Sequence, residues 1–170
     1  MNGAQALIRT LVQAGVDVCF MNPGTSEMHF VAALDDVPEM RGVLCLFEGV
    51  VTGAADGYGR MADKPAATLL HLGPGLGNGL ANLHNARRAG TPVVNIVGDH
   101  ATGYGQDIFL TSDIASVAAN LESWVGVAGS SADVGRLAAE AVAAATGAPN
   151  QVATLLLPAD ASWSEGATPS

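Results

Sequence analysis

The chain has 170 residues, a length that suits one domain with a full hydrophobic core. Its net charge of −9 at pH 7 argues against nucleic acid or an anionic membrane surface as a partner. Hydrophobic residues make up 49% of the chain and aromatic residues only 5%, so we expect small aliphatic side chains to pack helices closely against a sheet.

The sequence gives no sign of export or membrane insertion. The N-terminus lacks a basic stretch followed by an apolar core, and no apolar run reaches the ~18 residues that a membrane-spanning helix needs. We therefore expect a cytoplasmic protein. Cys19 and Cys45 each lie in an apolar run without CxxC spacing, which predicts buried free thiols.

Hydrophobic periodicity and turn residues predict strands that alternate with helices along the chain. The predicted elements are a helix over residues 3–14, a strand over 16–20, a loop over 21–27 leading into a helix, a strand over 42–47, a helix over 49–62, a strand over 66–72, a loop over 73–79, a helix to residue 89, a strand over 92–97, a long loop over 98–112, a short helix capped by Ser112 or Asp113, an ambiguous segment over 121–128, a helix over 131–146 and a strand over 152–157. The remaining residues, 158–170, look like the beginning of a linker.

This alternation predicts a three-layer α/β/α fold with a mostly parallel, doubly wound sheet of about six strands. Ligands of such sheets bind beyond the carboxyl ends of the strands. The segments expected at those ends are residues 22–26, Glu48, the glycine-rich residues 73–79 and the loop that begins at Gly98. We therefore expect one functional rim.

Two helix features need explanation. Thr25 or Ser26 is expected to cap the helix after residue 27, with Glu27 favouring its positive end. The helix over residues 49–62 contains four glycines, and each interior glycine costs about 0.5–1 kcal/mol relative to alanine. Another backbone or a ligand is therefore expected to come very close to that helix.

Each candidate residue also has a structural interpretation. Glu48, a carboxylate after an apolar run, could be a capping or ion-paired acid or a catalytic one. His71 could be a hydrogen-bonded structural histidine or a catalytic one. The remaining histidines have no spacing that would build a metal site with His71. The glycines of residues 73–79 lack the third glycine of the dinucleotide fingerprint and follow the third strand, so nucleotide binding is disfavoured.

Four segments carry a family resemblance, in the expected order: NPGT (22–25), EGVVTGAADGYGR (48–60), GPGLGN (73–78) and TPVV (91–94) ahead of Gly98. Together they resemble the N-terminal pyrimidine-binding (PYR) domain of thiamin-diphosphate-dependent enzymes, in the acetolactate synthase and benzoylformate decarboxylase group. The similarity spans roughly residues 2–163, which we expect to be the domain, with 164–170 starting an interdomain linker. The segment 48–60 is its most specific part.

The resemblance implies that Glu48 hydrogen-bonds N1′ of the cofactor's aminopyrimidine and helps to form its imino tautomer. His71 and Thr25 fall where benzoylformate decarboxylase carries an active-site His and Ser, which makes His71 a second catalytic candidate. The cofactor-binding positions that the resemblance implies are Pro23, Gly24, Thr25, Glu48, Gly75 and Asn78. The sequence GPG at 73–75 looks more like acetolactate synthase, yet Gly98-Asp99-His100 replaces the Gly-Gln that is usual in that branch.

The resemblance further implies a 2-keto acid substrate and a partner. In this family the cofactor's diphosphate is held through Mg²⁺ by a Gly-Asp-Gly…Asn motif in a separate PP domain, and this sequence lacks that motif. We therefore expect the chain to be inactive alone, as an N-terminal fragment or as the small subunit of a split decarboxylase. A homodimer or tetramer through PYR domains is expected, and the intact enzyme could also hold FAD. The competing hypotheses are a non-catalytic dimerisation or regulatory module and a Rossmann-type nucleotide binder.

Overall fold

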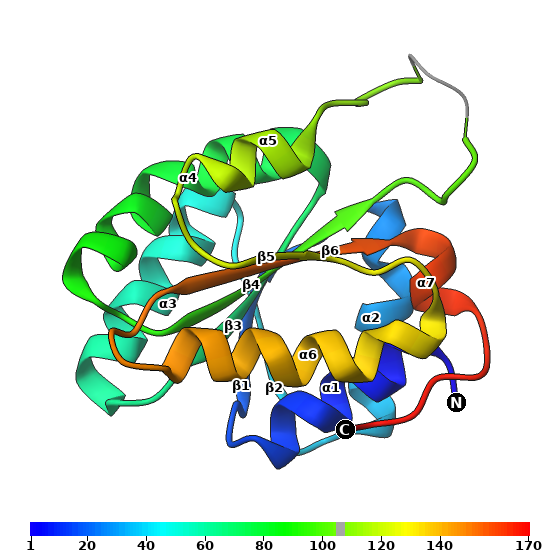
Figure 1. The fold of residues 1–170 in the computed structure, drawn as a ribbon, viewed down its shortest axis with the longest axis horizontal. Helices are drawn as coiled ribbons and strands as arrows, with labels where there is room; N and C mark the ends of the chain where they lie inside the picture. Colours follow the sequence, from blue (N-terminus) through cyan, green and yellow to red (C-terminus); the bar gives the residue numbers. More distant parts are fainter. Residues whose placement is uncertain (105–107) are drawn as a thin grey trace.

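The computed structural model describes residues 1–104 and 108–170. One six-stranded sheet lies between two layers of helices, and every strand pairing is parallel, in the order β2-β1-β3-β4-β6-β5 (Figure 1). The predicted three-layer α/β/α fold with a doubly wound sheet is confirmed.

The strands alternate with helices along the chain, as the sequence predicts. The strands are β1 (Val18–Asn22), β2 (Arg41–Leu44), β3 (Ala66–Leu70), β4 (Val93–Asp99), β5 (Val125–Val127) and β6 (Val152–Pro158). The helices are α1 (Gly3–Gln13), α2 (Met28–Asp36), α3 (Glu48–Ala62), α4 (Leu72–Ala89), α5 (Ile114–Ala119), α6 (Ser131–Thr146), α7 (Ala159–Trp163) and the 3₁₀ turn η1 (Thr25–Glu27). Strands β3 and β6 are buried along their whole length, because helices cover both of their faces.

Two hydrophobic cores lie on the two faces of the sheet. Helices α1, α2 and α6 pack their apolar residues on one face, and α3, α4 and α5 pack on the other (Figure 1). Both cysteines are buried and free, as predicted, and burial raises the pKa of the Cys19 thiol. A polar ladder also crosses the buried sheet, where Thr68 donates to Asn95 at 2.8 Å and Asn95 donates to Thr154 at 3.1 Å.

The chain changes direction between β1 and β3, which are neighbours in the sheet. The helix after β1 lies on the α1 side, whereas the helix after β3 lies on the opposite side (Figure 1). Connections that leave adjacent strands toward opposite faces open a crevice beyond their carboxyl ends. This crevice is where the fold places the candidate site.

The expectation that residues 73–79 form a loop was wrong, because they are the first turns of α4. Their glycines lie where side chains would collide: a Cβ on Gly73 would lie 1.6 Å from Ser112 Oγ, and one on Gly79 would lie 2.8 Å from Thr52 Cγ2. Pro74 is tolerated because it occupies the first helical turn, where its missing N–H has no intrahelical partner to lose.

Several element boundaries also differ from the prediction. The second strand ends at Leu44, so Glu48 is the first residue of helix α3 and does not end a strand. The ambiguous segment contains strand β5. The stretch after residue 158 begins with helix α7, and residues 164–170 then lie along α1 and α6, where Ser131 Oγ donates to the Glu165 carbonyl and the Ser170 N–H donates to Thr10 Oγ1. The described part of the predicted loop over 98–112 contains no helix beyond the end of β4; residues 105–107 lie outside the described residues.

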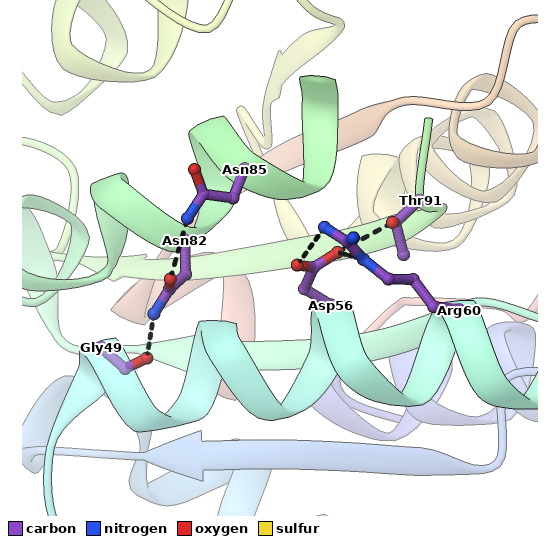
Figure 2. Close-up of polar contacts among 6 residues, drawn as sticks. All are labelled: Gly49, Asp56, Arg60, Asn82, Asn85 and Thr91. Atoms are coloured by element: carbon purple, nitrogen blue, oxygen red, sulfur yellow. Dashed lines mark hydrogen bonds and ion pairs between the residues drawn. The ribbon is translucent and has the colours of Figure 1, made fainter. Parts of the chain in front are cut away.

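Two glycines of α3, Gly53 and Gly59, face other elements of the chain. A Cβ on Gly59 would lie 2.5 Å from Thr91 Cγ2, and one on Gly53 would lie 3.0 Å from Asn82 Nδ2 on α4. Figure 2 shows the polar contacts beside them: Asn82 donates to the Gly49 carbonyl at 2.7 Å, and Asp56 accepts from Arg60 and Thr91. The close approach predicted for this helix is therefore made, at these positions, by helix α4 and by Thr91 ahead of β4.

Candidate active site

The carboxyl ends of β1, β3 and β4 meet around the Glu27 side chain, which is 2% exposed. Its Oε2 accepts the Gly24 N–H at 2.7 Å and lies 2.7 Å from Nδ1 of His71, the residue that follows β3. Its Oε1 lies against Gly98 of β4, where a Cβ would come within 1.7 Å. Burial raises the pKa of Glu27, although the Gly24 N–H and His71 act in the opposite direction.

The cap predicted for the helix after residue 27 was wrong. Neither η1 nor α2 has a side-chain cap, and the Thr25 side chain is exposed. Glu27 instead reaches back to the Gly24 N–H, which closes the turn from its interior side. The backbone of β1 and the following turn is thereby fixed against the end of β3.

Glu48 opens helix α3 on the neighbouring part of the rim and is partly exposed. Its Oε2 accepts a hydrogen bond from Asn78 Nδ2 at 3.0 Å, and Gly75 lies so close that a Cβ there would be 3.3 Å from Oε1. No ion pair joins Glu48 to a basic side chain among the described residues. The carboxylate is therefore oriented by a neutral amide and not neutralised by a cation.

The turn from β3 into α4 connects these two groups. The His71 carbonyl accepts the Gly75 N–H at 2.9 Å, so the backbone that carries the imidazole also positions the residue beside Glu48. Between them, Leu72 has a φ of +53° although its side chain is buried. Left-handed backbone is unfavourable for leucine and is kept only where the surroundings hold it. This strained residue is the one that joins His71 to the rest of α4.

A cavity of about 440 Å³ lies beside His71. Its wall includes Thr25 and Ser26 from η1, His100 after β4, and the aromatic side chains of Tyr104, Phe109 and Trp163. In size it falls within the range of small-molecule sites, and its mixed apolar and polar wall is typical of them. Among the described residues, no group of three or more His, Cys, Asp and Glu side chains could hold a metal ion.

Four of the apolar residues that flank Glu48 in the sequence lie at the protein surface. Leu44, Leu46, Phe47 and Val50 are all exposed, and Leu46 is 92% exposed. We call these four residues the Glu48 apolar surface.

No helix in the described part of the chain is long and apolar enough to cross a bilayer.

The structure therefore places the predicted site residues in two adjacent groups on one rim. Thr25 and His71 line the cavity, with Gly24 packed against the His71 ring, and Glu48, Gly75 and Asn78 lie together at the start of α3. Pro23 precedes Gly24 in the turn after β1. Sequence reasoning gave Glu27 only a helix-end role, and no local signal reveals that Gly98, 71 positions later, leaves room for its carboxylate.

Comparison with known proteins agrees with this geometry. A family model for the thiamine pyrophosphate enzyme N-terminal TPP binding domain matches residues 1–119. The chain belongs to this family. A Mycobacterium tuberculosis protein assigned provisionally as an acetolactate synthase large subunit, IlvX, is 67% identical over 168 residues, which cover 98% of this chain and 32% of that protein.

Two further relatives of this thiamin enzyme domain come from the decarboxylases. Benzoylformate decarboxylase of Pseudomonas aeruginosa is 33% identical over 156 residues, which cover 90% of this chain and 29% of the enzyme. A solved structure of Rhodococcus jostii RHA1 thiamine diphosphate-dependent 4-hydroxybenzoylformate decarboxylase has a TM-score of 0.91 at 27% identity, covering 99% of this chain and 32% of that one. The chain thus spans about a third of the length of these relatives.

The residues present fit the aminopyrimidine end of thiamin diphosphate. Glu48 offers a carboxylate with no ion pair to a basic side chain among the described residues, and Gly75 lies beside it, where a Cβ would come within 3.3 Å of Oε1. A Cβ at Gly24 would lie 2.4 Å from the His71 ring, so the turn after β1 also approaches the rim as bare backbone. A side chain at Gly24 would collide with the His71 ring, and one at Gly75 would crowd the Glu48 carboxylate, so these glycines keep both groups in place at the rim.

Proposed function

We propose that the chain supplies the pyrimidine half of an active site that acts on 2-keto acids with thiamin diphosphate, in a decarboxylase or an acetolactate-synthase-like carboligase. The observation that carries the proposal is the placement of Glu48, held by Asn78 and facing bare backbone at Gly75. Thiamin diphosphate, when bound, supplies the carbanion chemistry, and the protein supplies position and proton control.

Each predicted residue then has a task. Glu48 shares a proton with the pyrimidine nitrogen N1′, and Asn78 holds its carboxylate in place for this. Pro23, Gly24 and Gly75 border the ring through their backbone. His71 holds or releases a proton at its free ring nitrogen toward a substrate in the cavity, which Thr25 also lines. The aromatic side chains in the wall of that cavity suit an apolar group on the keto acid.

The proposal requires a partner. Mg²⁺ and the diphosphate would be held by a PP domain or subunit, because this sequence lacks the Gly-Asp-Gly…Asn motif that holds them in the family. The Glu48 apolar surface supports such a partner, since exposed apolar residues around a carboxylate mark a surface that another protein covers. We infer that the chain alone is inactive, that copies associate through this domain, and that the complete enzyme works in the cytoplasm. FAD is a further candidate cofactor of the complete enzyme.

The test uses the full-length gene product, together with its PP-type partner if that is encoded separately. It is assayed on pyruvate and benzoylformate with thiamin diphosphate and Mg²⁺. Glu48→Gln is expected to lower kcat at least ~100-fold, because one positioned proton-transferring group typically contributes 10²–10⁴-fold.

Glu39→Gln is the matched control, since Glu39 is exposed in the connection before β2. It makes the same chemical change away from the rim and should retain wild-type turnover. Turnover of Glu48→Gln equal to wild type would exclude the proposed role of Glu48. Absence of any thiamin-dependent activity in the wild-type assembly would favour a non-catalytic dimerisation or regulatory module.

A further inference from the structure

The Glu27 carboxylate has a strongly asymmetric environment. Oε2 has two partners at 2.7 Å, the Gly24 N–H and His71 Nδ1, whereas Oε1 is buried without a hydrogen-bond partner in the described part of the chain. A buried carboxylate with an unpaired oxygen is costly unless it serves another purpose. The nearby Gly98 leaves the space that this oxygen occupies.

The contacts of Oε2 define which atom of His71 carries the proton. The Gly24 N–H can only donate, so Oε2 already acts as an acceptor. In a protonated carboxyl group, the oxygen that carries the proton is the poorer hydrogen-bond acceptor. When Glu27 is protonated, its proton therefore belongs on Oε1, and Oε2 remains the acceptor. The 2.7 Å contact is then Nδ1–H donating to Oε2, which leaves Nε2 as the free nitrogen of the neutral imidazole.

His71 is suited to use that free nitrogen. Its ring lines the cavity, its side chain is 23% exposed, and Gly24 packs against the ring atoms on its Nδ1 side. The strained backbone at Leu72 fixes the chain that follows it. A ring held on one side by a carboxylate and open on the other has one nitrogen for orientation and one for chemistry.

We propose that Glu27 is a positioning residue that holds His71 in its Nδ1–H tautomer, with Nε2 free for proton exchange with a molecule in the cavity. When Nε2 takes up one proton, the imidazolium remains paired with the Glu27 carboxylate; when it gives up that proton, the neutral Nδ1–H form returns. The use of this proton on a 2-keto acid rests on the proposed function, but the tautomer does not.

The tautomer can be measured directly on the 170-residue chain labelled with ¹⁵N. Long-range ¹H–¹⁵N spectra distinguish protonated from unprotonated ring nitrogens at a pH where the imidazoles are neutral. The chain has four histidines, so His71→Asn identifies the His71 signals by their loss. His84, which is exposed on α4, serves as an internal reference for a solvated ring.

Wild type should show His71 as the Nδ1–H form. Glu27→Gln should keep this tautomer, because the glutamine oxygen can still accept from the Gly24 N–H and from Nδ1–H. Glu27→Leu should lose it, and the His71 signals should then resemble those of His84. An Nε2–H tautomer in wild type, or an unchanged tautomer in Glu27→Leu, would overturn the proposal. If Glu27→Leu does not fold, the wild-type tautomer alone decides. The assay of Glu48→Gln tests the function separately, so the two can fail independently.

Discussion

Glu27 is a carboxylate that the fold removes from water at the ends of three strands, and its ionisation should be visible in the stability of the protein. Burial raises its pKa above the ordinary value of 4.5, so the folded chain still holds this proton at pH values where the unfolded chain has released it. The contribution of Glu27 to stability is therefore fully present below pH ~4.5 and is lost as pH rises through the folded pKa.

Glu27→Gln cannot titrate, so its free energy of unfolding should lack this decline. The free energies of unfolding of the variant and wild type are measured by urea unfolding at a series of pH values. The stability of the variant relative to wild type should rise as pH increases above about 4.5, and then level off. Glu39→Gln, which removes an exposed carboxylate, serves as the control. A difference between Glu27→Gln and wild type that is constant across this range would contradict the raised pKa.

The same residues show what sequence reasoning could and could not find. Glu48, Gly75 and Asn78 were named because the site around Glu48 is built from two short segments whose motifs are readable. The link between Glu27 and His71 joins residues 44 positions apart, and the space for the carboxylate depends on Gly98. Such a contact follows from strand order, which local patterns do not specify.

At the scale of elements, the glycines of α3 allow a matched comparison. A methyl group at Gly57 would meet nothing within 4 Å, whereas one at Gly59 would lie 2.5 Å from Thr91 Cγ2. Gly57→Ala should therefore raise the free energy of unfolding by ~0.5–1 kcal/mol, since alanine is the better helix former. Gly59→Ala should lower it by ~1–3 kcal/mol, because it overpacks a filled interface. Denaturant unfolding of the isolated chain measures both, and equal effects would show that packing against Thr91 does not select glycine.

The start of α4 explains why one predicted loop was wrong. Glycine and proline within a few residues normally indicate a turn, and the sequence over 73–79 fits that rule. Here tertiary packing overrides the local preference. A side chain at Gly73 would collide with Ser112, one at Gly75 would crowd Glu48, and one at Gly79 would collide with Thr52. Helix α6, whose periodicity is clear, was predicted with its observed bounds, Ser131–Thr146, because its pattern and its packing agree.

At the scale of the whole molecule, the Glu48 apolar surface determines how the chain should behave in solution. Its four apolar residues are exposed and flank, in the sequence, the carboxylate proposed to meet the cofactor. If copies associate through this domain, the weight-average mass of the 17.1 kDa chain in sedimentation equilibrium should rise with concentration. Leu46→Glu should abolish this rise, because a charge would be buried without a partner when two such surfaces meet.

Met61→Glu is the matched control for that experiment. Met61 is 89% exposed, nearly as much as Leu46, but it lies at the far end of α3 from Glu48, so it introduces the same charge away from the Glu48 apolar surface. It should associate like wild type. Equal association of Leu46→Glu and wild type would place the contact elsewhere, and a wild-type chain that stays monomeric at every concentration would assign this surface to a partner of a different sequence. Glu48 lies within this surface, so whichever protein covers it also determines whether Glu48 is shielded from water.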